Sequence, residues 1–371
     1  MKTTKQIHKK DSERCTDNDR CSAIDNFSPV EQVALAASTY DSSYAPAEQI
    51  PTIVVENFPV LGKLAAFRFI EWVQQNPGGV ISLPTGKTPE HFIHWVKFVL
   101  SGWGSETVIA ELKAFNINCA IKPDMKTLHF VQIDEFYPME ASHKNSFYHY
   151  VQQYYIKGFG LDSAKALLIN TSDIGLKKGE TLKDIWPQLE VDLTLRYRKA
   201  ITRQEEKQKA LLASVDQWCV DYEASIKKLG GIGFFLGGIG PDGHIGFNIS
   251  GSDHYSSTRL CPVNYETQAA AAVDLGGIEV ARKSLVITIG LRTITWNKNC
   301  TAIIIAAGQA KADIVARAIE STPTIKEPAT VLGKLPNARF YITQGAAASL
   351  KARQFHQLEL ATELRDDQVE D

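Results

Sequence analysis

The chain has 371 residues, and its 40 Lys and Arg nearly balance its 42 Asp and Glu, which leaves a formal net charge of −2. With charges so nearly balanced, the overall charge gives no reason to expect binding to nucleic acid or to an anionic membrane surface. The six cysteines are scattered without a Cys-x-x-Cys pair, so we expect no metal or redox site of that spacing, and reduced thiols in a cytoplasmic protein.

The beginning of the chain is polar. Residues 1–48 carry too little apolar surface to offset the entropy cost of ordering, so we predict a mobile arm there. No apolar stretch of the signal-peptide type follows the charged start, and no window approaches the roughly 18 apolar residues that span a bilayer. The composition changes near residue 52, and one folded domain is predicted over residues 49–371.

Short apolar runs alternate with segments of helical periodicity over the rest of the chain. Strands are predicted at residues 53–55, 80–83, 127–133, 167–169, 233–236, 285–289, 302–306 and 339–343. Helices are predicted at residues 61–72, 91–100, 147–156 and 311–320. This alternation predicts a three-layer α/β fold, in which a Rossmann-like, largely parallel sheet has helices on both faces. The charged stretch 179–229 is predicted to be a helical insertion at the surface.

The loop LPTGKTP at residues 83–89 lies between a buried strand and a helix. Gly86 allows a tight turn, Thr88 is placed to cap the helix with Pro89 at its first position, and free N–H groups at a helix start suit a phosphate. The Gly-Lys-Thr triplet suggests a nucleotide-binding P-loop, but that motif needs a glycine where this chain has Ile81. A phosphate-binding loop and an ordinary strand–helix turn stay open.

An acidic residue follows the predicted strand 127–133. Because that strand is apolar enough to be buried, Asp134 emerges at the edge of the sheet, with Glu135 after it. Ligands of open parallel sheets gather outside the carboxyl ends of the strands, where a carboxylate can act as a general base toward a carbon acid next to a carbonyl. A helix cap or a surface acid is the alternative for Asp134 considered alone.

A third loop, GGIGPDGHIGFN at residues 237–248, follows another apolar run. It contains a G-x-G-x-x-G pattern, but a dinucleotide site would also need a helix to begin here, and Pro241 and the residues after it lack helical character. The loop places Asp242 two residues before His244. A nearby carboxylate fixes the tautomer of an imidazole, which suits proton transfer.

Lys311 is a further candidate at the start of a predicted helix. A lysine at this place can reach a phosphate as a point charge, whereas a solvated helix residue is the alternative. No cluster of His, Cys, Asp and Glu has the spacing of a metal site, so none is predicted.

In this order, the segments resemble the glucosamine-6-phosphate deaminase family, within the wider group that includes the 6-phosphogluconolactonases. The resemblance depends on LPTGKTP, IDEF with HKNSF after it, GGIGPDGHIGFN, SSTR and AAGQAK, and it covers residues 52–350 apart from the stretch 179–229. The form DGHIGFN is closer to the deaminases than to the lactonases. The resemblance implies a small lid segment and an aldose–ketose isomerisation of glucosamine 6-phosphate, with loss of ammonia, that gives fructose 6-phosphate without a metal or an organic cofactor.

By position, the resemblance also implies a role for each candidate residue. The sugar phosphate would bind at Thr85, Gly86, Lys87, Thr88 and Lys311. Asp134 would take the proton from carbon 2 of the open-chain sugar, and His244, supported by Asp242, would open the pyranose ring. Arg259 is a candidate for the lid or for the phosphate.

Two positions differ from the family pattern. Ile249 stands where the deaminases have a Glu that orients the histidine. The deaminases clamp the phosphate with a lid Arg, and here Val273 lies near its place, with Arg259 and Arg282 as the nearest substitutes. Two alternatives therefore stay open: a 6-phosphogluconolactonase-like hydrolase in which His244 activates water, and a catalytically impaired sugar-phosphate-binding protein. The predicted partner is a small-molecule sugar phosphate, without nucleic acid or membrane, and both a monomer and a homo-oligomer fit the family.

Overall fold

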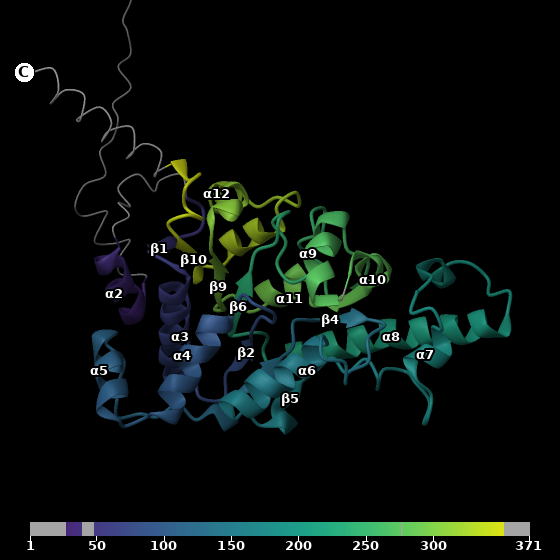
Figure 1. Cartoon of the computed structure of the whole chain (residues 1–371), viewed down its shortest axis with the longest axis horizontal. Helices are drawn as coiled ribbons and strands as arrows, with labels where there is room; N and C mark the ends of the chain where they lie inside the picture. The colour runs from purple at the N-terminus through teal and green to yellow at the C-terminus, as the bar shows by residue number, and fades with distance from the viewer. Residues whose placement is uncertain (1–26, 39–47, 276, 352–371) are drawn as a thin grey trace, which may run out of the picture.

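The computed structural model describes residues 27–38, 48–275 and 277–351 of the chain (Figure 1). The strands in this part are β1 (Thr52–Val55), β2 (Val80–Ser82), β3 (His129–Val131), β4 (Asp134–Tyr137), β5 (Ala166–Leu167), β6 (Phe234–Gly238), β7 (Arg259–Cys261), β8 (Leu285–Thr288), β9 (Thr301–Ala306) and β10 (Ala338–Thr343). The main sheet is seven-stranded in the order β1-β10-β9-β6-β2-β3-β5, and its neighbouring strands are all parallel. A smaller sheet has the order β4-β8-β7 and is antiparallel.

Helices cover both faces of the main sheet (Figure 1). Those described are α2 (Pro29–Ala37), α3 (Phe58–Gln75), α4 (Glu90–Ser101), α5 (Glu106–Ala114), α6 (Phe147–Val151), α7 (Leu182–Ile185), α8 (Arg203–Lys228), α9 (Tyr265–Leu275), α10 (Ile278–Lys283), α11 (Leu291–Thr295) and α12 (Ala312–Glu320). Strand β9 separates two apolar cores, because Ile303 and Ile305 pack toward α3 and α4, whereas Ile304 packs toward α8 and α12. The predicted three-layer α/β architecture is therefore confirmed.

The smaller sheet differs from the prediction. The expected strand 127–133 ends early, at Val131, and Asp134 begins β4 instead of a loop. Between the two strands, the side-chain amide of Gln132 bonds to two backbone groups. Its Oε1 accepts from Ile169 N at 2.9 Å, and its Nε2 donates to the carbonyl of Asp134 at 2.8 Å. The chain thereby passes from one sheet into the other. Strand β7 and helix α5 were not predicted either.

The prediction of a mobile arm is wrong for residues 29–37, which form α2. Ser28 and Glu31 make a reciprocal capping box at its start. The Glu31 carboxylate is 2% exposed, accepts a hydrogen bond from the hydroxyl of Tyr341 at 2.6 Å, and lies 3.5 Å from Nε of Arg339. Through these contacts, the buried carboxylate of Glu31 bonds α2 to strand β10. The rest of the predicted arm, residues 1–26 and 39–47, lies outside the described residues.

The stretch 179–229 is helical as predicted, but its second half is not a surface insertion. Helix α8 packs one face into the core. The buried residues on this face are Leu211, Leu212, Val215, Cys219, Tyr222, Glu223 and Ile226. The hydroxyl of Tyr222 donates to the carbonyls of Gln132 and Leu167, at 2.8 and 3.0 Å, so α8 is bonded to the ends of β3 and β5.

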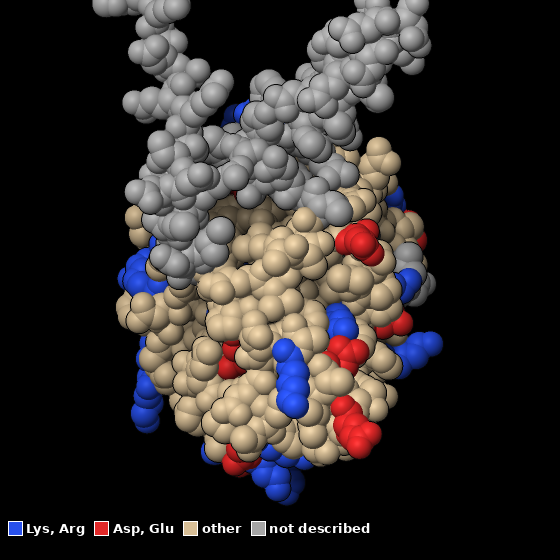
Figure 2. Space-filling view, turned by 90° about the vertical axis from the view of Figure 1, so that its left-hand side faces the viewer, with Lys and Arg blue, Asp and Glu red and all other residues tan. Residues whose placement is uncertain are grey.

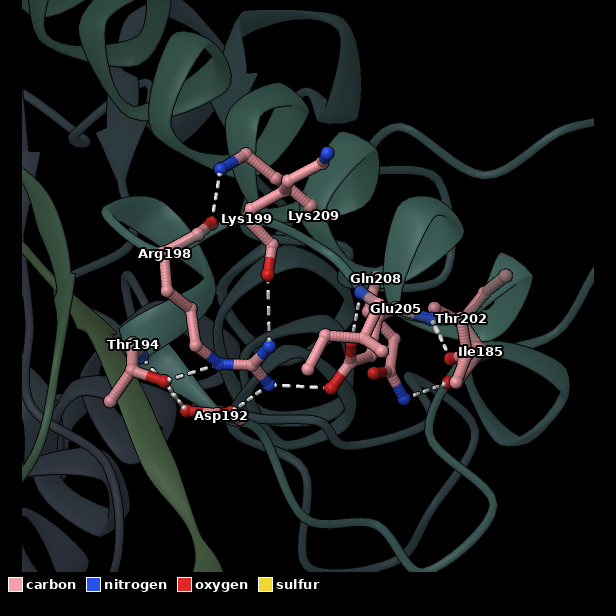
Figure 3. A network of polar contacts seen from close by, with 10 residues as sticks. Ile185, Asp192, Thr194, Arg198, Lys199, Thr202, Glu205, Gln208 and Lys209 are labelled. Carbon is pink, nitrogen blue, oxygen red and sulfur yellow. Dashed lines mark hydrogen bonds and ion pairs between the residues drawn. The ribbon is translucent and has the colours of Figure 1, made fainter.

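A polar network joins the loop before α8 to the first turns of that helix (Figure 3). The guanidinium of Arg198 contacts Asp192 at 2.7 Å and Glu205 at 2.6 Å, and its Nε donates to Oγ1 of Thr194 at 3.0 Å. Lys209 donates to the backbone carbonyl of Arg198 at 2.7 Å. Because these groups lie near the surface, salt screens them, and their contribution is to order the loop rather than to stabilise the fold strongly.

Charges are mixed on the end of the molecule that lies at the left in Figure 1. Figure 2 shows Lys and Arg side chains scattered among Asp and Glu on this face, without a patch of one sign. Within the described ranges, no helix is both long and apolar enough to cross a bilayer.

Candidate active site

A cavity of about 270 Å³ opens at the carboxyl ends of β2 and β6, next to the start of β4. Its lining residues come from six stretches of the chain: Pro84, Thr85, Thr88, Ile133, Asp134, Phe136, Phe147, Gly237, Gly238, Ile239, Gly240, Pro241, His244, Gly246, Phe247, Thr267 and Lys311. Thr85, Thr88, Asp134, His244 and Lys311, predicted from four separate segments, thus meet in one place. This is the position expected for a ligand of a parallel sheet.

The loop between β2 and α4, residues 84–88, is called the β2–α4 loop below. The helix after it begins differently from the prediction, because Pro89 is the N-cap residue and no side chain caps the helix. The side chain of Thr88 therefore does not cap the helix. It lies against β6 instead, where a Cβ placed on Gly238 would be 3.4 Å from Thr88 Oγ1. Its hydroxyl is free to contact a ligand in the cavity.

Backbone amides of the β2–α4 loop are available to an anion. Gly86 has φ of +78°, a conformation that favours glycine. The N–H groups of Thr85, Gly86 and Lys87 donate no hydrogen bond to any residue that the structure describes. The side chain of Lys87 is exposed and does not line the cavity, so the predicted contact of Lys87 with phosphate is restricted to its backbone.

Asp134 is the first residue of β4, and its carboxylate lies in the cavity wall. It pairs with Thr288 of β8 and is 7% exposed. Within the described part of the chain, no group donates a hydrogen bond to this carboxylate, although its backbone carbonyl accepts one from Gln132. Burial, with a smaller contribution from the neighbouring Glu135, raises the pKa of Asp134 to about 8. A buried carboxylate without a partner is poised to accept a proton or to pair with a cation.

Glu135, the next residue, has a different surrounding. Its carboxylate is fully buried and accepts hydrogen bonds from the amides of Phe136, Phe147 and Tyr148 and from the hydroxyl of Ser146, at 2.7 to 3.1 Å. Burial raises the pKa of Glu135 to about 7, against the effect of these donors. Glu135 therefore anchors the start of α6 and is not a second cavity acid. The motif HKNSF held a signal for the start of α6, since Ser is a preferred N-cap residue and Ser146 caps this helix.

His244 and Asp242 form a hydrogen-bonded pair. Nδ1 of His244 lies 2.5 Å from Oδ1 of Asp242. The second carboxylate oxygen of Asp242 accepts from the amide of Ser250 at 3.0 Å and from Nδ2 of Asn264 at 2.7 Å. Burial raises the pKa of Asp242, but these hydrogen bonds outweigh it and hold the pKa well below the usual range. With Nδ1 directed at a carboxylate, the neutral ring has an unprotonated Nε2.

Gly240 is required by the close approach of the imidazole. A Cβ at this position would lie 1.9 Å from Cε1 of His244, well inside any real contact. The ring also stacks on Phe247, with centroids 6.2 Å apart. The glycines of this loop therefore hold a histidine, and the rejection of a dinucleotide motif is consistent with the geometry.

Two residues near the histidine were missed from the sequence. Thr267, on α9, places its hydroxyl 3.3 Å from Nδ1 of His244, and Asn264, just before α9, contacts Asp242. Oδ1 of Asn264 also accepts from the amide of Thr267 at 3.1 Å. The region where the resemblance places the lid thus bonds to the His–Asp pair. The Thr and Asn types had no motif around them that would have indicated this contact.

The arginine candidates lie elsewhere. Arg259, on β7, donates to Oδ1 of the buried Asn248 at 2.9 Å and does not line the cavity, so its role at the lid or the phosphate stays a prediction. Arg282 is exposed on α10 and pairs with Glu279 at 2.9 Å. Neither replaces a phosphate clamp in this conformation.

Lys311 is the cation of the cavity. Its ammonium donates to the backbone carbonyl of Ile239, on the wall formed by the β6 loop. Burial lowers the pKa of Lys311, and the nearby Asp242 opposes this effect. Among the residues described, no group of three or more His, Cys, Asp and Glu could hold a metal ion.

Comparisons with known proteins agree with this geometry. No family model matches the chain. The chain is similar to glucosamine-6-phosphate deaminase 2 of Bacillus subtilis, with 26% identity over 305 residues, 82% of this chain and 98% of that one. A glucosamine-6-phosphate isomerase of Candida albicans is 33% identical over 144 residues, 38% of this chain and 57% of that one. The predicted resemblance to glucosamine-6-phosphate deaminases and isomerases is confirmed by these relatives.

Solved structures share the fold. A monomeric glucosamine-6-phosphate deaminase of the NagB superfamily has a TM-score of 0.58 at 20% identity, covering 81% of this chain and 100% of that one. A 6-phosphogluconolactonase from Trypanosoma brucei has a TM-score of 0.51 at 15% identity, covering 82% and 99%.

Proposed function

We propose that this protein converts glucosamine 6-phosphate, or a close amino-sugar phosphate, into fructose 6-phosphate and ammonia. The observation that carries the proposal is the carboxylate of Asp134, to which no described residue donates a hydrogen bond, in a cavity that is also lined by Thr85 and Thr88 of the β2–α4 loop and by His244 of the His244–Asp242 pair. The similarity to deaminases over 98% of a relative's length supports it.

The phosphate end of the substrate fits the β2–α4 loop. The amide of Thr85, the hydroxyls of Thr85 and Thr88, and the ammonium of Lys311 offer both hydrogen bonds and positive charge to the cavity. The amides of Gly86 and Lys87 follow in the same loop, and neither donates to a described residue. Backbone N–H groups at such a turn bind phosphate directly through hydrogen bonds, and no metal ion is needed.

Asp134 would perform the proton transfer between carbons. In the open-chain aldose, the carboxylate takes the proton from carbon 2, and an enolamine forms. Return of that proton to carbon 1 leaves a ketimine at carbon 2, which water hydrolyses to the ketone and ammonia. The raised pKa makes Asp134 a stronger base than an exposed aspartate, and the ammonium group of the substrate would pair with the ionised carboxylate.

His244 would open the sugar ring before that step. Its Nε2 can take the proton of the anomeric hydroxyl and return it to the ring oxygen as the bond between that oxygen and carbon 1 breaks. Asp242 stabilises the imidazolium that exists between the two transfers. Ile249 supplies no second carboxylate, and the Thr267 hydroxyl is the additional polar contact at Nδ1.

The test is turnover of two substrates by the purified protein. Glucosamine 6-phosphate is supplied in one assay and 6-phosphogluconolactone in another, while ammonia, fructose 6-phosphate and lactone loss are followed. Release of ammonia with equimolar fructose 6-phosphate supports the proposal. Lactone loss alone would assign hydrolysis by a water that His244 activates, and binding without either reaction would assign a sugar-phosphate-binding protein.

The proposed setting is the cytoplasm, where the thiols of Cys119, Cys219, Cys261 and Cys300 stay reduced. Light scattering of the protein with and without substrate distinguishes a monomer from a homo-oligomer.

A further inference from the structure

Two tyrosine hydroxyls reach the β2–α4 loop from the helical segment that follows Ser146. The hydroxyl of Tyr155 donates to the carbonyl of Pro84, and that of Tyr150 donates to the carbonyl of Gly86 at 3.0 Å. Tyr155 is fully buried and Tyr150 is half-buried. Burial raises the pKa of both phenols above the usual value, so both stay protonated and act as donors at neutral pH.

These bonds determine where the loop directs its amides. In a trans peptide the C=O and the N–H point in opposite directions. The carbonyls of Pro84 and Gly86 are held toward the tyrosines, so the N–H groups of Thr85 and Lys87, in the same peptide units, point away from them. These two N–H groups have no partner among the described residues. The tyrosines therefore remove two carbonyl oxygens, which would repel an anion, and leave two donors available.

The local helix geometry explains how both tyrosines reach the same loop. Side chains three or four residues apart face each other on an α-helix, so an α-helix would align Tyr154 rather than Tyr155 with Tyr150. Residues Gln152–Lys157 form a π-helix, in which hydrogen bonds close over five residues. The ring centroid of Tyr150 is 4.4 Å from that of Tyr154 and 6.1 Å from that of Tyr155, so the wider turn brings Tyr155 close as well as Tyr154. Such π segments are rare and are frequent at functional sites.

The same helical segment is anchored beside the proposed base. Glu135, adjacent to Asp134 in β4, accepts the hydroxyl of Ser146 at 2.7 Å and the amide of Tyr148 at 2.7 Å. One end of the segment is thus bonded to the strand that carries Asp134, and the other end is bonded to the β2–α4 loop. It fixes the separation of the two parts of the cavity that would hold carbon 2 and the phosphate.

We propose that Tyr150 and Tyr155 are positioning residues, which set the amides of the β2–α4 loop for the phosphate and hold that loop at a fixed place relative to Asp134. The inference rests on the proposed function, because it assigns the phosphate of the substrate to this loop. Neither tyrosine lines the cavity, so loss of either hydroxyl should act on phosphate affinity and not on the chemical step.

The experiment compares the wild type with Tyr150→Phe and Tyr155→Phe. Tyr154→Phe is the matched control, because Tyr154 lies in the same π-helix and its ring packs against Tyr150 at 4.4 Å, while its hydroxyl bonds to no described residue. Binding of inorganic phosphate is measured by calorimetry, and KM and kcat are measured with glucosamine 6-phosphate. We expect Tyr150→Phe to raise the Kd of phosphate and the KM about threefold to tenfold, the factor for one lost hydrogen bond, with kcat changed less than about twofold. Tyr154→Phe should match the wild type.

The outcomes separate this inference from the proposed function. A lower melting temperature of Tyr150→Phe with unchanged phosphate Kd and KM would show that the hydroxyl is merely structural, and would overturn the positioning role while the deaminase proposal stands. A wild type that neither binds phosphate nor releases ammonia would overturn both. If Tyr155→Phe does not fold, Tyr150→Phe alone decides the matter, because the half-buried ring keeps its packing when only the hydroxyl is removed.

Discussion

Replacing Asp134 by Asn should stabilise the protein, and increasingly so as the pH rises. The pKa of Asp134 is raised from 3.8 to about 8 by burial. Between these values the folded chain keeps a proton on Asp134 that the unfolded chain has released. Stability therefore falls with rising pH through this window, by about 1.4 kcal/mol per pH unit for this single group. Asn mimics the protonated carboxyl and has no such dependence.

The magnitude follows directly. From pH 6 to pH 8 the free energy of unfolding of Asp134→Asn, relative to the wild type, should increase by roughly 2 to 3 kcal/mol. Urea denaturation at pH 6, 7 and 8 measures it, provided that the m-values of the two proteins agree. Asp221→Asn is the control, because Asp221 is an exposed carboxyl on α8.

The result that would refute the reasoning is a constant difference between Asp134→Asn and the wild type over this range. It would mean that Asp134 is ionised throughout, and that an unseen cation or solvent compensates its burial. The same carboxyl gives a kinetic expectation: a base must be unprotonated, so kcat/KM of the wild type should rise about tenfold per pH unit well below the pKa. Asp134→Asn should bind the sugar phosphate without turnover.

Three further predictions concern other parts of the structure. Asp242→Asn should lower kcat by at least about a hundredfold in steady-state assays, because His244 loses the charge that stabilises its imidazolium; a kcat near that of the wild type would exclude the pair from proton transfer. Gly240→Ala should also suppress kcat, since its Cβ would lie 1.9 Å from the imidazole, whereas Gly333→Ala, with nothing closer than 3.7 Å, should be tolerated. Glu31→Ala should cost about 3 to 5 kcal/mol in denaturation experiments, because it removes the buried carboxylate that contacts Arg339 and the hydroxyl of Tyr341; a loss below about 1 kcal/mol would contradict the anchoring of α2.

The sequence predicts the main sheet well because its strands are short apolar runs buried on both faces. It predicts Asp134 for a related reason, since an acid directly after such a run must lie near the sheet edge. It does not reveal that Asp134 opens a second sheet, because the transfer depends on Gln132 bonding to Ile169, 37 residues away. The sequence also does not show that Glu135 anchors α6 while Asp134 faces the cavity, because this difference depends on the contacts of Glu135 with residues 146–148.

Two errors have different physical causes. Helix α8 was placed at the surface because its composition is charged, although Leu212, Val215, Cys219 and Tyr222 recur at helical spacing and could have been recognised as a buried stripe. Helix α2 could not have been predicted as docked in this way. Its burial depends on Glu31 meeting residues of β10 about 310 positions later, which no local pattern encodes.

The order of the main sheet has a consequence for synthesis of the chain on the ribosome. Among the described strands β1 is made first and β10 last, yet β1 lies at the edge of the main sheet beside β10 and pairs with no other strand there. Its backbone therefore has no described strand to pair with until β10 has been made. Until then, an unpaired apolar strand is open to wrong pairing with other nascent chains. We expect the main sheet to be completed late and cooperatively, when β10 inserts between β1 and β9.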